Sequence, residues 1–481
     1  MSTEASPRAT GYAWLALRGT AGLLAVIAII QWIDALTTGR PVLYGEGAVA
    51  SAALLFRDGD PYGDVPGRFV AANYPPLYLW LASLGDPFHT GRAVTIASAL
   101  AVSVLVWWRA SGLDRVPRAA LTLLWPALVP VAIWGAAVKP DMLAVALTFG
   151  GVAVLERSVR AGSPAWSGAS GPLLGGALLA LAVWAKPTAL LPALAVLGLV
   201  AVSARPVFWR SAVGAAAVAA LALGHAALLG AGDVWRHVVV WNALPWSAEQ
   251  ALLLAVLGAA TLGILLAAAS LAGAFRGIAL AYLLGAGGVA LLGGREGATV
   301  NYLLDLGAAT VFGVSGVAAR LGASAGFPLA GAAQLLLGFA VLAPFGIVPG
   351  RDGGTGAWGP AERMEVVRSL ERDEPHLVED SGLLVANGIT PVIDDVFLWS
   401  RLLSRGEIGP DLGAGLAGSG IYATVVSEFD LERYDEATAA QRARWHPLLV
   451  REVLARYELD PSVAETVSRG GRPVLWVYRP R

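Results

Sequence analysis

The sequence predicts a polytopic α-helical membrane protein with a small α/β domain at its C-terminal end. Of its 481 residues, 56% are hydrophobic and 14% are charged, whereas an average soluble domain has roughly 25% charged residues. The charge is unevenly distributed, since segment 351–481 holds about half of it in about a quarter of the length. We therefore expect a transmembrane domain over 1–350 and a soluble domain over 351–481.

Composition also excludes several classes of protein. The 34 Lys and Arg residues balance 35 Asp and Glu residues, which gives a formal net charge of −1. The chain therefore has no overall positive field that would hold nucleic acid. Because it contains no cysteine, disulfides, thiolate catalysis and Cys-ligated metal sites are excluded as well.

Apolar runs of about 15–22 residues follow one another through the first domain, close to the roughly 20 residues that cross a hydrocarbon core of about 30 Å. The first run is too long for the apolar region of a signal peptide and lacks a small-x-small cleavage site, so we expect a retained anchor. The glycine- and alanine-rich sequence suits close helix packing in lipid. About eleven spans are predicted, over 12–36, 93–109, 119–137, 141–156, 172–185, 187–203, 211–230, 251–271, 277–293, 300–318 and 327–346.

Arginines in alternate loops orient these spans, because short cytoplasmic loops carry an excess of Lys and Arg. The N-terminus is then cytoplasmic, and the C-terminal domain lies outside the plasma (inner) membrane. The same side receives the long first loop 37–92, loops 231–249 and 294–301, and two helix–helix turns. The orienting arginines are Arg8, Arg109, Arg115, Arg118, Arg157, Arg160, Arg205, Arg210, Arg276 and Arg320.

Nearly all unusual polar residues of the membrane domain fall on this outer side. Ionisable groups at the edge of a bundle are costly and usually line a cavity or a substrate path, so the outer face is the expected site. The residues are Glu46, Asp58, Asp60, Asp64, Lys139, Asp141, Lys186, Asp233, Arg236, His237, Arg295, Glu296 and Asn301, with Asp305 just inside a span. An ordinary solvated loop charge is an equally good interpretation of four of them, Asp58, Asp60, Asp64 and Asp233.

The two lysines are the sharpest signal in the sequence. All other Lys/Arg positions are arginine, and both lysines precede proline at an outer turn, in Lys139-Pro140-Asp141 and Lys186-Pro187-Thr188. Proline suits the first turn of a helix, so each ammonium lies beside a helix N-terminus, where free N–H groups and the helix dipole also favour an anion. The two turns therefore predict a phosphate cradle, with snorkelling interfacial lysines as the alternative.

The first outer loop contains the candidate general base, Glu46. A partly desolvated carboxylate that faces cations can take a proton from an attacking hydroxyl. Asp58 and Asp60, in a turn of sequence RDGDPY, are alternative carboxylates, and Tyr74 lies in NYPPLY, which leads into a short apolar helix. A loop of this length between spans is rarely without function.

Two later outer segments carry further candidates. Trp235-Arg236-His237 and the Trp-rich segment 241–246 predict a belt at the membrane interface, with sugar stacking as the alternative. Arg295 and Glu296 precede Asn301, Tyr302 and Asp305 at the entry of a late span. For this last group a structural ion pair and a substrate clamp are equally good interpretations.

The soluble segment alternates strand-like and helix-like patterns, which predicts a small α/β domain that caps the outer face. Strands are expected at 376–380, 389–393, 421–429 and 473–480, and helices near 381–387, 395–405 and 436–457. Asp380 and the Asp394-Asp395 pair follow short strands, where ligand-facing groups are common, but a solvated surface is the favoured interpretation. We expect a role in acceptor recognition or in gating a cavity mouth.

The arrangement resembles the membrane-embedded GT-C glycosyltransferases, which include protein O-mannosyltransferases and lipid A aminoarabinose transferases. It is similar to the bacterial branch with a Tyr-Pro-Pro-Leu motif in the first outer loop. The sequence departs from that branch at Gly45-Glu46-Gly47, where relatives more often show Asp-Glu or a bulky residue after Glu. The matching stretches are YGEGAVASAALLFRDGDPYGD (44–64), NYPPLYLWLA (73–82), Gly91-Arg92, KPDMLAVAL (139–147), AKPTALLP (185–192) and NYLLDL (301–306).

This resemblance implies a polyprenyl-phosphate-linked sugar donor and an extracytoplasmic acceptor, which is a glycan, a lipid or a protein. It implies that Glu46 is the catalytic base of an inverting hexosyl or pentosyl transfer, in which Lys139, Lys186 and Arg295 bind the donor phosphate. A divalent metal is optional, and the sequence contains no HExxH motif or P-loop. The substrate-binding candidates are Asp58, Asp60, Tyr74, Asp141, Arg236, His237, Glu296, Asn301, Tyr302 and Asp305.

A transporter or flippase of polyprenyl-linked glycans is the alternative function. Transport would favour polar residues through both halves of the bundle and inverted repeats with broken helices. The polar residues gather at one face instead, and no repeat is evident beyond the two Lys-Pro turns. These observations favour the glycosyltransferase.

Overall fold

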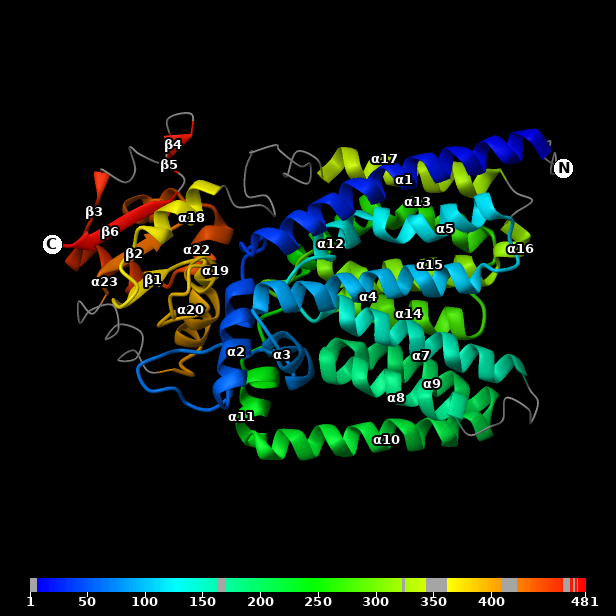
Figure 1. The fold of residues 1–481 in the computed structure, drawn as a ribbon, viewed down its shortest axis with the longest axis horizontal. Helices are drawn as coiled ribbons and strands as arrows, with labels where there is room; N and C mark the ends of the chain where they lie inside the picture. Colours follow the sequence, from blue (N-terminus) through cyan, green and yellow to red (C-terminus); the bar gives the residue numbers. More distant parts are fainter. Residues whose placement is uncertain are drawn as a thin grey trace.

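The helices of the membrane domain run side by side, and the C-terminal domain covers one end of this bundle (Figure 1). The N-terminus lies at the opposite end, so the first helix begins far from the domain that closes the chain. The structure is a computed structural model that describes residues 7–161, 170–321, 325–342, 361–408, 422–461, 468–469, 472–473 and 475–481.

Helices occupy most of each predicted span within the described residues. Five helical segments are long and apolar enough to cross a membrane: Pro7–Thr38 (α1), Pro87–Arg109 (α4), Asp141–Arg160 within Asp141–Ala161 (α7), Arg205–Leu228 (α10) and Ala248–Leu271. Four shorter apolar segments are Ser170–Ala185 (α8), Pro187–Ser203, Ile278–Leu292 (α14) and Gly326–Leu342 (α17). The helical membrane class is confirmed, and a total of about eleven crossings stays a prediction.

Several spans are assembled from shorter helical pieces. Segment 187–203 comprises Pro187–Ala189 (η1) and Leu190–Ser203 (α9), and segment 248–271 comprises Ala248–Gly258 (α12), Ala259–Gly263 (η3) and Ile264–Leu271 (α13). Two more predicted spans are divided into Arg115–Ala127 (α5) and Val129–Trp134 (α6), and into Val300–Leu303 (η4) and Leu304–Gly316 (α15). The connections contain Glu46–Asp58 (α2), Pro76–Ser83 (α3), Ala231–Trp235 (α11), Arg236–Val240 (η2) and Ala318–Leu321 (α16).

Glycine permits some of the closest helix contacts in the bundle. A Cβ on Gly176 would lie 1.9 Å from the carbonyl oxygen of Ser211, and one on Gly214 would lie 2.1 Å from that of Leu173. Both contacts join α8 to α10, so any larger side chain at these positions would force the two helices apart. The small residues therefore serve helix packing, as their abundance predicts.

A buried glutamine supports the π-helical turn η3. Such a turn disturbs the regular helical ladder, and lipid offers no partners for freed backbone groups. Gln334 of α17 accepts a hydrogen bond from the Ile264 N–H at 2.6 Å and donates one to the Ala260 carbonyl oxygen at 2.6 Å. The amide thus satisfies one backbone group within the turn and one directly after it, and it holds α17 against the turn.

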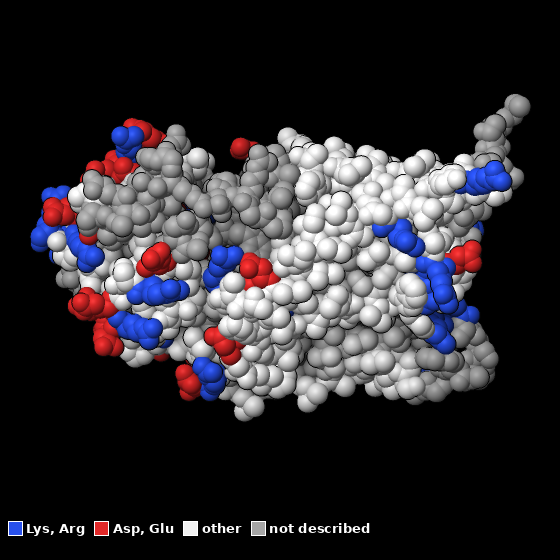
Figure 2. Space-filling model, turned by 45° about the horizontal axis from the view of Figure 1, so that its top comes forward, with Lys and Arg blue, Asp and Glu red and all other residues white. Residues whose placement is uncertain are grey.

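Charged residues lie mainly at the two ends of the molecule. Figure 2 shows a broad uncharged band between a C-terminal domain with both signs of charge and an opposite end where basic residues predominate. Arg109 ends α4, Arg115 begins α5 and Arg205 begins α10, which places these arginines at that opposite end. The pattern agrees with a cytoplasmic position for this end, and the orientation stays a prediction.

The C-terminal domain contains a four-stranded sheet in the order β1-β2-β6-β3. Strand β1 (His376–Val378) is parallel to β2 (Thr424–Ser427), whereas β6 (Trp476–Pro480) is antiparallel to both β2 and β3 (Tyr457–Leu459). The other elements are Ala361–Arg368 (α18), Ser381–Ala386 (α19), Val396–Ser404 (α20), Leu431–Glu436 (η6), Ala439–Arg444 (α22), Pro447–Arg456 (α23), and the paired strands Ser468–Arg469 (β4) and Arg472–Pro473 (β5). A small α/β domain is therefore present, as predicted.

Two sequence predictions for this domain are wrong. Segment 389–393 is not a strand of the sheet, because its hydrogen bonds go to the first outer loop: Phe69 N–H donates to the Val392 carbonyl oxygen at 2.8 Å. The long helix expected near 436–457 is divided into α22 and α23. The division falls at Pro447, which lacks an N–H and disfavours a helical conformation for the residue before it, so His446 is extended and caps α23.

The same outer loop fastens the domain to the bundle. Asp394 N–H donates to the Phe69 carbonyl oxygen at 3.2 Å, and Ala71 N–H donates to Asp394 Oδ1 at 2.8 Å. On the helical side, Phe397 N–H donates to the Tyr44 hydroxyl at 3.2 Å. The domain therefore forms one wall of the region around Glu46.

Candidate active site

Each Lys-Pro turn precedes a helix, as the sequence predicts. Lys139-Pro140 leads into α7, which begins at Asp141, and Lys186 is the N-cap residue of η1, which begins at Pro187. Lys139 contacts the start of α2, where the C-terminal domain is attached. Both lysines also act electrostatically on each other. The turns therefore belong to one region at the end of the bundle that the C-terminal domain covers, which is the predicted outer end.

Glu46 lies at the first position of α2 and is completely buried. Its Oε2 accepts hydrogen bonds from the N–H groups of Val42 at 2.5 Å and Leu43 at 3.1 Å, and its Oε1 accepts one from Val138 N–H at 2.6 Å. Arg92 Nη2 lies 3.2 Å from Oε2. The carboxylate is thus bonded to three backbone N–H groups and paired with a buried guanidinium.

Arg92 is the functional-site residue to which sequence reasoning gave no role. Its guanidinium donates to the carbonyl oxygens of Ala35 at 2.7 Å, Arg40 at 2.5 Å and Ala136 at 3.2 Å, besides pairing with Glu46. Three segments of the bundle are therefore fixed around the carboxylate. Its position at the edge of an apolar run could have marked Arg92 as a site residue, since a cation at such a position needs a partner.

Lys139 contacts the residue before Glu46. Its Nζ donates to the Gly45 carbonyl oxygen at 2.7 Å and lies 5.6 Å from the centre of the Tyr74 ring. Gly45 has φ 80°, a left-handed conformation that favours glycine. The first lysine therefore lies beside Tyr74 and the backbone that precedes the candidate base, and its role in the reaction stays a prediction.

Gly47, which follows Glu46, lies against the C-terminal domain too closely for a side chain. A Cβ at Gly47 would lie 2.1 Å from the Gly382 nitrogen and 2.4 Å from the Ser381 hydroxyl, both at the start of α19. No side chain fits in that space without moving the C-terminal domain. The departure from the family pattern at this position is thus a consequence of the close contact between α2 and α19.

The second lysine forms a cluster with four other predicted residues. Lys186 Nζ lies 2.5 Å from Asp141 Oδ1, and Asn301 Nδ2 donates to the same oxygen at 2.8 Å. The ammonium also lies 4.9 Å from the centre of the Tyr302 ring. Asp305, which is nearly buried in the first turn of α15, adds a further negative charge that acts on Lys186. Five predicted site residues are thus brought together.

Part of this cluster has unused hydrogen-bonding capacity. Within the described part of the chain, Asp141 Oδ2 and the Thr188 hydroxyl are buried and have no hydrogen-bond partner. Buried polar atoms are rarely left in this state unless a water, an ion or a ligand completes the site. The cluster around Lys186 is therefore the part of the outer end that is best suited to take an additional polar group.

Other predicted residues lie apart from the two lysines. Asp58 and Asp60 are exposed at the far end of α2, where a twelve-residue rise separates Asp58 from Glu46 by about 18 Å. Asp60 forms a local turn by accepting from Tyr62 N–H at 2.9 Å. Arg236 pairs with Asp64 at 3.1 Å on the surface. Asp58, Asp60 and Arg236 could therefore contact only a substrate large enough to extend beyond the lysine region.

His237 is buried beside aromatic rings. Its ring centre lies 4.0 Å from that of Trp241 and 5.8 Å from that of Tyr62. Burial, with the nearby charge of Arg236, lowers the pKa of His237 to about 4. The imidazole is therefore neutral near pH 7, and its surroundings are those of a packed core residue.

Loop 294–301 connects the cluster to the C-terminal domain. Asn301 binds Asp141 at one end of the loop, and Glu296 pairs with Arg401 of α20 at 3.0 Å near the other end. The backbone of Arg295 pairs with Trp246 in an antiparallel bridge. Among the contacts of the described residues, none joins the Arg295 side chain to either lysine, so its predicted role at the donor phosphate stays a prediction.

Asp380, Asp394 and Asp395 of the C-terminal domain are buried, contrary to the solvated surface favoured from the sequence. Asp380 caps α19 by accepting from Gly382 N–H at 3.1 Å, and Asp395 caps α20 by accepting from Leu398 N–H at 3.0 Å. Both helices pack toward the bundle, which removes their caps from solvent. Burial, with the nearby charge of Glu428, raises the pKa of Asp380 to about 7. Burial also raises the pKa of Asp395.

Asp395 faces the first lysine across the domain contact. Among the neighbouring charges, it acts most strongly on Lys139, ahead of Asp141 and Glu46. The C-terminal domain therefore contributes negative charge to the same region. Within the described ranges, no group of three or more His, Asp or Glu residues is arranged to hold a metal ion.

Comparisons with known proteins place this geometry in a known architecture. ArnT from Cupriavidus metallidurans, solved with bound undecaprenyl phosphate, is 15% identical and matches with a TM-score of 0.54 over 95% of this chain and 98% of ArnT. The chain has a GT-C fold. The apo oligosaccharyltransferase of Archaeoglobus fulgidus is 11% identical and matches with a TM-score of 0.52 over 93% of this chain and 73% of its own. Protein-family models and curated proteins give no match.

The GT-C resemblance predicted from the motifs is thus confirmed at the level of fold. The likeness spans both the bundle and the C-terminal domain, since it covers nearly all of this chain. A fold of this kind does not determine the reaction, which depends on the residues of the site.

Proposed function

We propose that this chain is a membrane glycosyltransferase that moves a sugar from a polyprenyl-phosphate donor to a hydroxyl group of an extracytoplasmic acceptor, with inversion. The observation that carries the proposal is the position of the two lysines, which lie in one region with Glu46 and Asp141. ArnT, which shares this fold, was solved with undecaprenyl phosphate. That ligand supports a lipid-linked phosphate as the donor class.

The donor phosphate would bind between the two helix N-termini. An ammonium has three N–H donors, and the Gly45 carbonyl oxygen occupies one on Lys139. Lys186 is paired with Asp141 in the structure, so a phosphate would compete with that carboxylate for the cation. Arg295 is a third predicted cation for the same group.

The transfer needs a base and a stabilised leaving group. In the proposed reaction the acceptor oxygen forms a bond to the anomeric carbon while the bond from that carbon to the phosphate oxygen breaks. The acceptor proton passes to Glu46, and the electron pair of the broken bond leaves with the polyprenyl phosphate. Lys139 and Lys186 stabilise the charge that develops on this anion.

The enclosed position of Glu46 sets a condition on this mechanism. The carboxylate is fully buried and bonded, so an acceptor hydroxyl must replace one of its present donors. The Leu43 N–H is the longest backbone contact, at 3.1 Å, and is the contact most easily given up. Hydroxyl binding near Leu43 would place the acceptor directly between the first span and α2.

Incubation of the purified protein in lipid nanodiscs with radiolabelled polyprenyl-phosphate sugars and native membranes tests the proposal. We expect one donor to lose its label to a membrane or envelope acceptor, and we expect Lys186→Met to prevent this. Loss of transfer from every donor, with donor binding intact, would contradict the proposed reaction. Movement of intact labelled donor across sealed proteoliposomes would instead favour the flippase alternative.

A further inference from the structure

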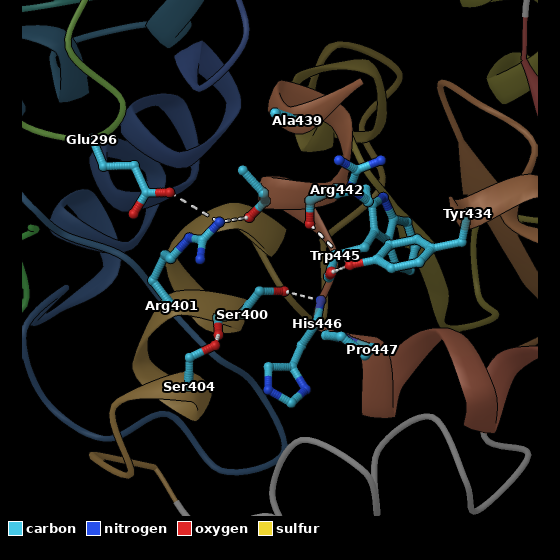
Figure 3. Close-up of a pocket in the computed structure, with 11 residues that line it drawn as sticks. Glu296, Ser400, Arg401, Ser404, Tyr434, Ala439, Arg442, Trp445, His446 and Pro447 are labelled. Atoms are coloured by element: carbon cyan, nitrogen blue, oxygen red, sulfur yellow. Dashed lines mark hydrogen bonds and ion pairs between the residues drawn. The ribbon is translucent and has the colours of Figure 1, made fainter. Parts of the chain in front are cut away.

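A cavity of about 460 Å³ lies between the C-terminal domain and loop 294–301. This is a volume at which small-molecule sites are common. Figure 3 shows Glu296 approaching from one side toward Arg401, while Tyr434 and Trp445 come from the other side. The lining comes from α20, η6, α22 and the turn before α23, together with the loop. The cavity is therefore formed mainly by the C-terminal domain, and Glu296 of the membrane half contributes to one side.

Arg401 lies at the centre of the polar lining and is incompletely bonded. Its Nη2 lies 3.0 Å from Glu296 Oε1 and donates to the Ala443 carbonyl oxygen at 2.8 Å. Its Nε is buried and, within the part of the chain that the structure describes, has no hydrogen-bond partner. A buried guanidinium N–H in this state is an unused donor, which a bound group can reach once the Arg401 side chain shifts.

The other polar side chains of the cavity also favour an anion. Arg442 and His446 line it together with Arg401, whereas Glu296 is the acidic residue among the lining residues. His446 Nδ1 accepts from Leu448 N–H at 3.2 Å, which leaves the proton on Nε2 and makes that nitrogen a donor. Basic and donor groups therefore outnumber the single carboxylate.

An aromatic ring gives the cavity the features of a sugar site. Tyr434 is held in place because its hydroxyl donates to the carbonyl oxygens of Trp445 at 2.8 Å and Arg442 at 3.2 Å. The ring therefore remains fixed beside the charged groups and offers an apolar surface. An aromatic body next to directed polar groups suits a ligand that has both apolar and hydroxyl-bearing faces.

The cavity is close to the cluster around Lys186. Glu296 lines it, and Asn301, five residues further along the same loop, binds Asp141. Five residues of fully extended chain span at most about 18 Å. A ligand in the cavity could therefore be one part of an oligosaccharide whose reacting end lies at the outer end of the bundle.

We propose that this cavity binds an anionic sugar unit of the acceptor, carrying either a carboxylate or a phosphate. Arg401 and Arg442 pair with the anionic group, His446 donates to it or to a hydroxyl, and the sugar ring lies against Tyr434. Glu296 competes with the ligand for Arg401. The assignment rests on the proposed glycosyl transfer for its biological meaning, but binding in the cavity is measurable without any transfer.

Equilibrium binding to the full-length protein in nanodiscs tests this assignment. The probes are methyl glucuronoside, methyl glucoside 6-phosphate and neutral methyl glucoside. We expect at least one anionic probe to bind about tenfold more tightly than the neutral one, the effect of one charge-assisted hydrogen-bonding group. Preference for the carboxylate or for the phosphate identifies the group, and equal binding of all three probes would overturn the assignment.

Two substitutions of opposite sign separate binding from folding. Arg401→Gln should weaken the preferred anionic probe about tenfold, whereas Glu296→Gln should strengthen it, because the guanidinium loses its competing carboxylate. A purely structural ion pair would not raise affinity when it is broken. Arg433→Gln, in the same domain but at an exposed position, is the matched control and should change nothing.

A measurement of donor affinity separates the test of the cavity from the test of the proposed function. Arg401→Gln should leave the affinity for polyprenyl phosphate unchanged, because Arg401 lies outside the lysine region. If the anionic probes bind selectively but no glycosyl transfer is found, the proposed reaction is contradicted and the cavity assignment stands. If transfer is found but the probes bind without selectivity and neither substitution changes their binding, the cavity assignment is contradicted and the proposed reaction stands.

Discussion

The two ends of the bundle each contain a buried glutamate paired with an arginine, yet they differ in what remains unbonded. At the end away from the C-terminal domain, which is the predicted inner end, Glu156 lies between Arg109 and Arg160. Arg109 also donates to the Ser315 hydroxyl at 3.1 Å and the Phe312 carbonyl oxygen at 3.2 Å. This cluster joins α4, α7 and α15 and uses its polar groups within the protein.

The outer end repeats the pairing with Glu46 and Arg92 but adds groups that are only partly used. Asp141 has one oxygen with two donors and one buried oxygen with no partner among the described residues. Both lysines of the chain lie here rather than at the inner end. A fully satisfied network stabilises a fold, whereas an incompletely satisfied one marks a place for a ligand. The cluster around Glu156 therefore has a structural role, whereas the cluster around Asp141 and the lysines is the candidate site.

The largest difference is expected between the two matched glutamates. Glu46→Gln removes the proposed base and should lower sugar transfer by about 10²–10⁴-fold, the usual range for general base catalysis. Glu156→Gln, which also neutralises a buried partner of an arginine, should lower the midpoint of thermal unfolding but preserve the transfer rate per folded molecule. Radiolabel transfer and thermal unfolding of the same preparations provide the check. Equal turnover by the Glu46 variant and the wild type would remove the base assignment.

A smaller effect is expected from the lysines on donor affinity. Lys186→Met and Lys139→Met should each weaken binding of polyprenyl phosphate about 10–100-fold, because a charge-assisted phosphate contact is lost. Arg160→Met removes a cation that is paired with Glu156 at the inner end and is 65% exposed, so the affinity should stay unchanged. Titration of each variant with polyprenyl phosphate measures this. Unchanged affinity in both lysine variants would exclude the phosphate cradle.

A feature of this fold or site can be predicted from the sequence when the residues that form it are close together along the chain. Helical spans and Lys-Pro turns are local patterns, so they are readable from the chain. The Glu46–Arg92 pair and the Asp141–Asn301 contact join segments far apart, and hydrophobic periodicity does not fix which helices are neighbours. Burial of Asp395 depends on domain docking, which no local pattern contains. The cavity at Arg401 is formed by the same docking and was missed for the same reason.

The pH dependence of stability tests the wall that the C-terminal domain adds to the outer end. Burial, then the charge of Glu428, raises the pKa of Asp380 to about 7 from 3.8. The folded state therefore binds the proton more tightly than the unfolded state. This contribution is complete below the unfolded pKa and is lost as pH rises through 7, a decrease of about 2 kcal/mol between pH 5 and 8.

Asp380→Asn should flatten that decrease, because asparagine stays neutral and its carbonyl oxygen can still accept from Gly382 N–H. Thermal unfolding of the wild type and the variant at pH 5, 6, 7 and 8 measures the difference in slope. The variant should gain relative stability at pH 8 and gain little at pH 5. Parallel curves for the two proteins would mean that Asp380 stays charged across this range.

The smallest expected effect concerns the contact that joins the two halves of the outer end. Gly47→Ala places a Cβ 2.1 Å from the Gly382 nitrogen, and such overpacking typically costs about 1–3 kcal/mol. Because Glu46 is the neighbouring residue, a shift of α2 away from α19 should also lower transfer several-fold and expose the C-terminal domain to limited proteolysis. Gly232→Ala, where a Cβ meets no atom within 4 Å, is the matched control. Unchanged proteolysis and transfer in Gly47→Ala would show that the domain contact does not position the carboxylate, and that the outer end works independently of the domain that covers it.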